Sequence, residues 1–396
     1  MNETFRGFLR PNGQIGIRNK LLIIAVDECC DGIARHIAKP FQEAVVLTNW
    51  YTCMLGGNEE TFHQMIAVGQ NPNVGGVLVI SMGCGSILPE QIAEPLRSFG
   101  QAVDTLTCEQ ERGTRRSIER GRMKLAALRE SMLTHPQIDA PIERLVIGVK
   151  CGGSDTSSGI ASNPSVGAAV DKLVDMGATC IGGELFELQG CEVLLAKRAA
   201  TPQIAEKIRK LIANEQHRWG VKGTDIETMS VGNCVGGLTT IEEKSMGALH
   251  KMGSRRIEDI LEINKNGVDR PSHPGFYLSE ASMLCGAAGV NYAAMGAHMI
   301  LWTSGAAGFN NAIVPVIRVS GNSELINEDI DISAAGIMDG TSGIDEVSQN
   351  IVSAVIRTAS GEPTAVEGLG DATMTLYQKD QRVENLLGLT SARCCH

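Results

Sequence analysis

The chain has 396 residues, more than one hydrophobic core ordinarily serves, so two α/β domains are expected. Its 43% hydrophobic and 20% charged residues are typical of a globular protein and exclude a disordered chain. The net charge of −10, the lack of a basic run and an aromatic content of only 4% argue against nucleic acid as a partner.

The first residues contain no apolar leader, and the apolar runs are too short to cross a membrane, so we expect a cytoplasmic protein. In that reducing compartment the twelve cysteines are not expected to form disulfides. They lack the Cys-x-x-Cys spacing of a zinc finger, and the chain has no His-Glu-x-x-His motif of a zinc protease. The cysteines are therefore expected either to pack in the hydrophobic core or to belong to a site other than a zinc finger or a zinc protease centre.

Short β-rich apolar runs alternate with helical patterns in the first part of the chain, which is typical of parallel α/β units. Strands are predicted at residues 21–26, 44–48 and 75–81, and helices at 32–39, 59–68 and 109–133. Residues 134–143, with Pro136 and Pro141, are the predicted linker between an N-terminal domain at 1–138 and a C-terminal domain at 139–396.

A second series of the same kind follows the linker. Strands are predicted at residues 144–149, 178–181, 298–303 and 313–319, and helices at 165–176, 202–218, 240–251 and 344–360. The predicted fold is α/β, with two Rossmann-like domains whose sheets are largely parallel and whose site lies in a cleft at the carboxyl ends of the strands. No Gly-x-Gly-x-x-Gly follows the first strand, which argues against a nicotinamide dehydrogenase.

Potential metal ligands stand beside glycines directly after several predicted strands. In chain order, the polar residues in these places are Cys29 and Cys30, Cys84, Cys151 with Ser154 and Asp155, Glu184 with Glu187, and Thr303. Because the carboxyl ends of parallel strands meet at one edge of a sheet, this concentration predicts the site. Each member also has a structural interpretation, since free cysteine packs as a small hydrophobe and acidic residues favour the start of a helix.

A glycine-rich stretch at residues 232–237 offers backbone N–H groups ahead of a predicted helix, which suits a carboxylate ligand. It lacks the Gly-Lys-Ser/Thr ending of a phosphate-binding P-loop. Thr240 and Glu243 match a capping box, so a purely structural role for both is an equal alternative. Lys244 is a base, a carboxylate clamp or a solvated charge, and His273 lies in a constrained loop between two prolines.

Several ordered motifs extend along nearly the whole chain. They are Gly16-Ile17-Arg18-Asn19, Cys151-Gly152-Gly153-Ser154-Asp155 with Asn163-Pro164, Glu184-x-x-Glu187, Gly236-Gly237-Leu238-Thr239-Thr240 followed by Glu243-Lys244, and Thr303-Ser304-Gly305. In these motifs the chain resembles the altronate and galactarate dehydratases and the large subunit of (2R)-sulfolactate sulfo-lyase. The resemblance implies a lyase that depends on Fe(II) or another divalent metal. It also implies a separate small subunit of the SAF type, because the matching region begins at residue 7.

These considerations assign candidate roles to individual residues. The candidate metal ligands are Cys84, Cys151, Glu184 and Glu187. The alternative is an iron–sulfur cluster held by Cys84, Cys151 and one of Cys29 and Cys30. The acid or base candidates are Lys244, His273 and Glu243. The candidates for binding a small hydroxy-acid substrate are Arg18, Asn19, Ser154, Asp155, Asn163, Thr239 and Thr303.

Elimination from a hydroxy acid requires a base for the weakly acidic proton next to the carboxylate and a charge that stabilises the resulting enediolate. The leaving group stays open at this point. Loss of hydroxide, which needs a proton donor, would make the protein a dehydratase that forms a 2-keto acid. Loss of sulfite, which favours cationic neighbours, would make it a sulfolactate sulfo-lyase subunit that forms pyruvate. A non-catalytic carboxylate-binding subunit is a further alternative, and we expect a homo-oligomer.

Overall fold

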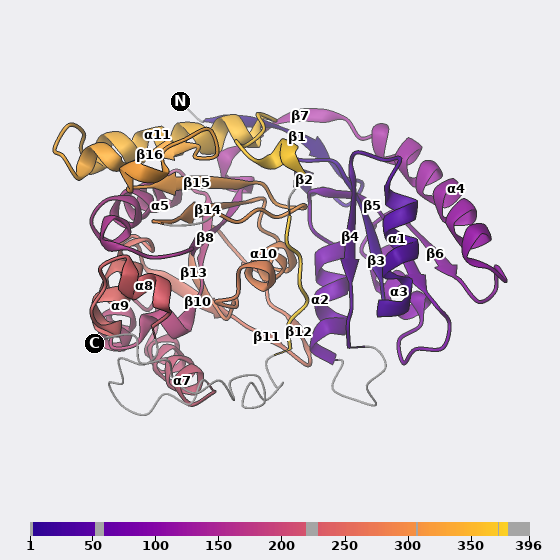
Figure 1. The fold of residues 1–396 in the computed structure, drawn as a ribbon, viewed down its shortest axis with the longest axis horizontal. Coiled ribbons are helices and arrows are strands. Elements are labelled where there is room, and N and C mark those ends of the chain that lie inside the picture. Colours follow the sequence, from indigo (N-terminus) through magenta and orange to yellow (C-terminus); the bar gives the residue numbers. More distant parts are fainter. Residues whose placement is uncertain (1–2, 52–58, 219–228, 306–307, 371, 379–396) are drawn as a thin grey trace.

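The structure is a computed structural model that describes residues 3–51, 59–218, 229–305, 308–370 and 372–378. It contains two parallel sheets with helices packed on them (Figure 1), so the predicted α/β class is confirmed. None of the described helices is long and apolar enough to span a membrane.

The first sheet has four parallel strands in the order β4-β3-β5-β6. Its strands are β3 (Lys20–Ala25), β4 (Ala44–Thr48), β5 (Val74–Ser81) and β6 (Val103–Thr107), and its helices are α1 (Asp31–Ala38), α2 (Glu59–Gly69), α3 (Pro89–Ser98) and α4 (Thr114–Leu133). Successive residues of β3 face opposite sides: Leu21 packs with α1 and α4, and Leu22 with α2 and α3. Burial on both faces explains why β3 and β5 are continuous apolar runs.

The second sheet has seven parallel strands in the order β10-β13-β9-β8-β14-β15-β16. Its strands are β8 (Val146–Cys151), β9 (Thr179–Gly182), β10 (Ile257–Leu261), β13 (Gly275–Ser279), β14 (Met299–Thr303), β15 (Val316–Ser320) and β16 (Ile332–Ser333). One face packs against α5 (Asn163–Asp175), α6 (Glu192–Lys197), α7 (Pro202–Arg218) and α11 (Ile344–Ala359). The other face packs against α10 (Cys285–Ala294), which also contacts α2, so one hydrophobic core joins the two sheets.

A small antiparallel sheet connects the two halves of the chain. Its strands, in the order β2-β1-β7, are β1 (Thr4–Leu9), β2 (Ile15–Gly16) and β7 (Gln137–Pro141). The segment predicted as a linker therefore contains a strand that pairs with the N-terminal strand along five residue pairs. The two prolines allow this because Pro136 precedes β7 and Pro141 ends it, and β7 is an edge strand.

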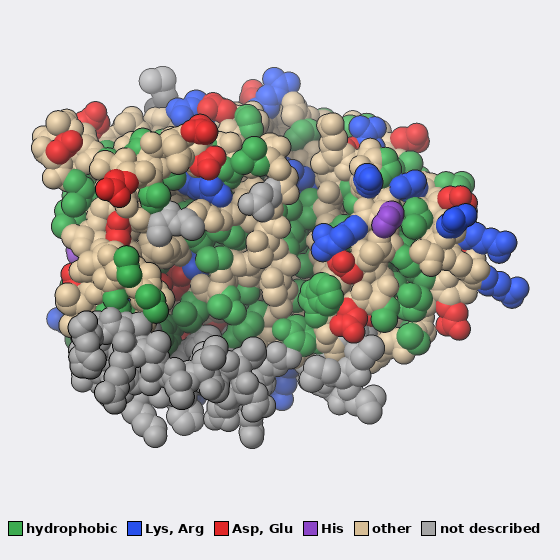
Figure 2. Space-filling model, viewed as in Figure 1, with side chains coloured by type: hydrophobic (Ala, Val, Ile, Leu, Met, Phe, Trp, Pro, Cys, Tyr) green, Lys and Arg blue, Asp and Glu red, His purple; other side chains and the backbone are tan. Residues whose placement is uncertain are grey.

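The remaining elements complete the surface of the molecule. They are α8 (Val231–Val235), α9 (Ile241–His250), β11 (Ile263–Asn264) and β12 (Gly267–Val268). The helix predicted at 109–133 begins only at Thr114, because residues 109–113 form turns in which Arg112 has a left-handed backbone conformation (φ 53°). On the face shown in Figure 2, acidic and basic side chains of the described residues are interspersed, with several basic ones at the α4 end.

We predict that Gly167→Ala destabilises the protein. A Cβ atom at Gly167, within α5, would lie 1.9 Å from the carbonyl oxygen of His250, so α5 and α9 approach closely only because this residue is glycine. Overpacking of this kind costs about 1–3 kcal/mol in the free energy of unfolding. Thermal and urea unfolding followed by circular dichroism measure the loss.

Gly32→Ala is the matched control, because Gly32 also lies in a helix, α1, but has no atom within 4 Å of the added Cβ. This control should be neutral or stabilising by up to about 1 kcal/mol, as expected for alanine in a helix. Equal unfolding midpoints for the two variants would show that the α5–α9 contact does not depend on Gly167.

Candidate active site at the carboxyl ends of the seven-stranded sheet

Three buried side chains converge where the central strands β8 and β9 end. Cys151 is the last residue of β8, and Glu184 and Glu187 follow β9, with Glu187 in the 3₁₀ helix η4 (Leu185–Leu188). One ligand atom from each of the three lies within 4.8 Å of the other two. The adjacent parallel pairing of β8 and β9 brings these residues, 33 and 36 positions apart, to the same place.

The backbone of Glu184 is strained. Its φ of 65° and ψ of 52° are left-handed, although it is not a glycine, and such a residue costs about 1–3 kcal/mol. The carboxylate is nevertheless held from several sides: Oε2 accepts from the backbone N–H of Cys151 at 3.0 Å and from Lys251 Nζ at 2.6 Å. A strained backbone persists only where surrounding contacts hold it in place, and such residues are typical of functional sites.

Three buried lysines surround the two carboxylates. Lys150 Nζ contacts Glu184 Oε1, and it also donates to the carbonyl oxygens of Cys151 and Met283. Lys244 Nζ lies 2.7 Å from Glu187 Oε1, and Lys251 Nζ bridges Glu184 and Glu187 at 2.6 and 3.2 Å. We call these three lysines, with Cys151, Glu184 and Glu187, the buried cluster.

The charges of the buried cluster follow from these contacts. Burial by itself would raise the pKa of Glu187, but Lys244 and Lys251 lower it well below its ordinary value, so this carboxylate is ionised. Burial would lower the pKa of each lysine, yet neighbouring groups outweigh it and raise all three, so the ammonium groups keep their protons. The largest raising influence is Glu184 for Lys150 and Glu187 for Lys244, whereas for Lys251 it is Cys151, followed by Glu184 and Glu187.

Cys151 behaves differently from the charged members. Burial, followed by the repulsion of the two carboxylates, raises the pKa of its thiol to about 11. The thiol therefore keeps its proton at neutral pH and donates it to Glu187 Oε2, with the sulfur 2.6 Å from that oxygen. Three ammonium groups then face two carboxylates and a neutral thiol, so the buried cluster carries an excess of positive charge.

A pocket of about 250 Å³ lies beside the buried cluster. Its walls come from the loop after β8, the start of α5 and the inner face of α9, and its lining includes Ser154, Asp155, Asn163, Glu243, Lys244 and His250. Lys244 belongs both to the pocket wall and to the buried cluster, with Nζ 3.3 Å from Ser154 Oγ. A small molecule in the pocket would therefore meet one ammonium group of the buried cluster directly.

Several residues that the sequence analysis predicted to act in catalysis or substrate binding lie at this pocket. Ser154, Asp155, Asn163, Glu243 and Lys244 line it, and Thr303 donates to Asn163 Oδ1 at 2.6 Å from the end of β14.

Some of these residues have local structural partners. Asp155 Oδ1 accepts from Ser157 and Ser158, and Glu243 Oε2 accepts from the backbone and hydroxyl of Thr239 at the start of α9. One half of the expected capping box is present, because Thr240 Oγ1 accepts from the backbone of Glu243. The Glu243 side chain accepts from Thr239 and not from the backbone of Thr240.

Other residues predicted to belong to the site do not line this pocket. Arg18 forms an ion pair with Glu367 and donates to three carbonyl oxygens, and Asn19 accepts from Arg10 and donates to Met132 O. His273 precedes β13 and therefore lies at the amino end of the sheet, whereas the buried cluster lies at the carboxyl end. Its partners there are Ser272, Tyr277 and Glu258.

The cysteines of the first sheet are also separate from the buried cluster. Cys30 is buried with its sulfur 3.8 Å from that of Cys108, and Cys29 and Cys84 are exposed. Among the described residues, the one group with metal-ligand spacing contains Cys151 and neither Cys84, Cys29 nor Cys30. The geometry therefore does not assemble the cysteine set that the iron–sulfur alternative requires.

Sequence reasoning missed Lys150, Lys251 and His250. A signal existed for two of them: Lys150 directly precedes Cys151, and Lys251 follows Lys244 by seven residues, two helical turns on the same face. His250 ends the same helix.

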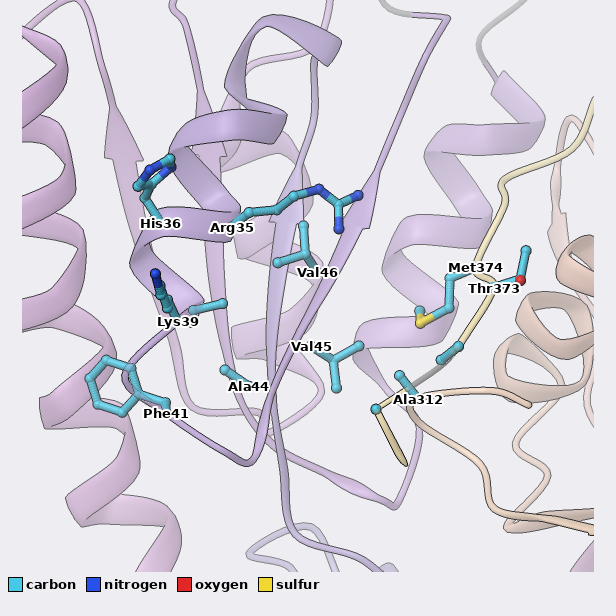
Figure 3. A pocket seen from close by; sticks show the side chains of 13 residues that line it. Arg35, His36, Lys39, Phe41, Ala44, Val45, Val46, Ala312, Thr373 and Met374 are labelled. Atoms are coloured by element: carbon cyan, nitrogen blue, oxygen red, sulfur yellow. The ribbon is translucent and has the colours of Figure 1, made fainter. Parts of the chain in front are cut away.

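A larger pocket, about 760 Å³, lies between β4 and the segment 372–374 (Figure 3). Its lining includes Val45, Val46, Met374, Arg35 and Lys39, and it contains no member of the buried cluster. The smaller pocket, which includes Lys244 of the buried cluster, is therefore the better candidate for the active site.

The geometry defines a class of protein: an α/β enzyme with buried acids, bases and potential metal ligands beside a small-molecule pocket. Comparison with known protein families also indicates an enzyme. Residues 7–133 match the family model "D-galactarate dehydratase/Altronate hydrolase, second domain", and residues 142–382 match "D-galactarate/Altronate dehydratase, C-terminal".

Individual relatives extend this result. The (2R)-sulfolactate sulfo-lyase subunit beta of Chromohalobacter salexigens is 30% identical over 94% of this chain and 97% of its own length. The altronate dehydratase of Bacillus subtilis is 31% identical over 91% of this chain and 75% of its own length. The galactarate dehydratase (L-threo-forming) of Escherichia coli is 28% identical over 91% of this chain and 73% of its own length. The chain belongs to the D-galactarate/altronate dehydratase family, and it is a lyase.

We predict that iodoacetamide alkylates Cys84 and spares Cys151 in the folded protein. Cys84 is exposed, whereas Cys151 is 2% exposed and its thiol proton is hydrogen-bonded to Glu187. Mass spectrometry of tryptic peptides after timed alkylation measures both sites, and unfolding in guanidinium serves as the control that should equalise them. Alkylation of Cys151 as fast as Cys84 in the folded state would contradict the buried, protonated thiol.

Proposed function

We propose that this lyase eliminates water from a small sugar acid or similar 2-hydroxy acid to give a 2-keto acid. The observation that carries the proposal is Lys244, which lines the 250 Å³ pocket and contacts Glu187 at 2.7 Å. The pocket volume of about 250 Å³ lies just below the range of about 300–1,000 Å³ for drug-sized ligands, which supports a small acid as substrate. The sugar-acid dehydratases among the relatives support the same chemistry.

The charge state of Lys244 supports an electrostatic role. Glu187 raises the pKa of Lys244 against the effect of burial, so its ammonium group stays protonated and can stabilise an enediolate or donate a hydrogen bond to a leaving hydroxyl. Abstraction of the proton next to the carboxylate then needs another group. We assign that step to His250, because it lines the same pocket and imidazole is the commonest general base. Ser154, Asn163 and Asp155 are the proposed substrate contacts from the pocket wall.

We further propose a divalent metal, Fe(II), held by Cys151, Glu184 and Glu187. The donor set supports it, because one thiol sulfur and two carboxylates lie within 4.8 Å of one another and suit a first-row transition metal. When bound, the metal would supply Lewis-acid stabilisation of the negative charge that develops on the substrate carboxylate. Ammonium groups already contact both carboxylates, so a metal that binds there must compete with them.

Elimination of sulfite is a second candidate function, and one observation favours it. Sulfite leaves as an anion, and three buried ammonium groups at this site provide the cationic surroundings that such a leaving group needs. The name of the relative (2R)-sulfolactate sulfo-lyase subunit beta also supports a separate partner subunit for our chain, which we propose to be small and of the SAF type.

Replacing Lys244 by Met should abolish the proposed elimination while leaving the fold intact. Loss of a positioned proton donor lowers kcat by about 10²–10⁴-fold. Initial rates of product formation, with circular dichroism as the measure of folding, check this. Lys207→Met is the matched control, because Lys207 pairs with Asp259 and Glu262 outside the pocket. A folded Lys244→Met variant with unimpaired turnover would exclude Lys244 from the mechanism.

A substrate panel decides between the two leaving groups. The chain is incubated anaerobically with Fe(II), with and without a co-expressed partner subunit, and with altronate, galactarate or (2R)-sulfolactate. For a dehydratase we expect 2-keto acid from a sugar acid and no sulfite from sulfolactate. Release of sulfite with pyruvate supports the second function instead. A folded, iron-loaded complex that releases neither product would contradict both proposed activities on these substrates.

A further inference from the structure

Lys251 lies between the two carboxylates of the buried cluster. Its Nζ donates to Glu184 Oε2 at 2.6 Å and to Glu187 Oε2 at 3.2 Å, and its side chain is fully buried. The same two oxygens accept from Cys151: Glu184 Oε2 from its backbone N–H and Glu187 Oε2 from its thiol. The inner oxygens of both glutamates therefore face Cys151 and share a single ammonium group.

The other two lysines have a different position. Lys150 contacts the outer oxygen of Glu184, Oε1, and Lys244 contacts the outer oxygen of Glu187, Oε1. Neither bridges the two glutamates through the contacts that the structure describes, and Lys150 is also fixed by two carbonyl oxygens. Among the three, Lys251 is therefore the lysine with described contacts to both inner oxygens, the same oxygens that accept from Cys151, so a metal held by Cys151 and both glutamates would compete with it.

We propose that Lys251 is an internal cation that competes with a divalent metal for Glu184 and Glu187. This inference rests on the metal site of the proposed function. A metal ion that contacts both inner oxygens requires the Lys251 ammonium group to leave them, since the two cations cannot share a position at hydrogen-bond distance. Two like charges about 4 Å apart repel each other strongly even at the effective dielectric of a protein surface. Lys251 therefore holds the two carboxylates together without a metal and weakens metal binding.

The experiment measures Co(II) binding directly, independently of turnover. Co(II) is titrated anaerobically into the purified full-length chain and into Lys251→Met, and the thiolate-to-cobalt absorption band reports binding at Cys151. We expect Lys251→Met to bind Co(II) at least tenfold more tightly than the wild type. Lys251→Arg keeps the charge and should bind as weakly as the wild type. Lys207→Met, outside the buried cluster, should leave the affinity unchanged. Cys151→Ser in the Lys251→Met background should lose the band.

Two further measurements keep the inference open to refutation if Lys251→Met does not fold. Lys251→Gln removes the charge but retains hydrogen-bond donors for the two carboxylates, and it should show the same gain in affinity. The wild type itself should bind Co(II) with a dissociation constant above about 1 µM. Nanomolar binding by the wild type, equal or weaker binding by a folded neutral variant, or no cobalt band in either protein would overturn the inference.

These outcomes are distinguishable from failure of the proposed function. Turnover of a hydroxy acid without any cobalt band would leave the lyase activity standing and overturn the role of Lys251. The expected gain in cobalt affinity without turnover on any substrate would leave Lys251 as an internal cation and overturn the proposed substrates.

Discussion

The two buried carboxylates of Glu184 and Glu187 set the requirement that the rest of this site satisfies. A buried ion costs several kcal/mol unless partners replace its water, so each carboxylate needs donors from the protein. The described contacts supply them to all four oxygens, from three ammonium groups and from the backbone and thiol of Cys151. The left-handed backbone of Glu184 is maintained by the same contacts, so strain and charge are stabilised together.

This requirement explains why particular elements meet. Parallel pairing of β8 with β9 brings Cys151 to the glutamates, and α9 must pack closely enough for Lys244 and Lys251 to reach them. That approach depends on α5, where Gly167 lies against the last carbonyl of α9. The hydrophobic core beneath this end of the sheet and the ion pairs above it therefore stabilise the same arrangement of helices.

Local patterns in the sequence predicted the parallel α/β class and part of the site. Apolar runs identified β8 and β9, and the residues directly after them included Cys151, Glu184 and Glu187, because strand ends are local features. The order of strands is not local, so the sequence could not show that the cysteine loops of the first sheet stand apart from Cys151. It also could not show that His273 precedes a strand, β13, whose apolar run was too short to recognise. Lys150 was overlooked because lysine is ordinarily exposed and because the predicted strand ended at residue 149, whereas β8 extends to Cys151.

The positive charge of the buried cluster would suit the elimination of different leaving groups by members of one family. Both eliminations begin with loss of the proton next to a carboxylate, and both develop negative charge that an excess of ammonium groups stabilises. Where they differ is at the leaving atom, since hydroxide needs a proton and sulfite does not. Lys244 can satisfy either need, as a proton donor or as a positive charge, because it lies at the boundary of the buried cluster and the pocket. Under the proposed function, the choice of leaving group would then depend on the other residues that line the pocket, such as Ser154, Asp155 and Asn163, and the buried cluster could stay the same.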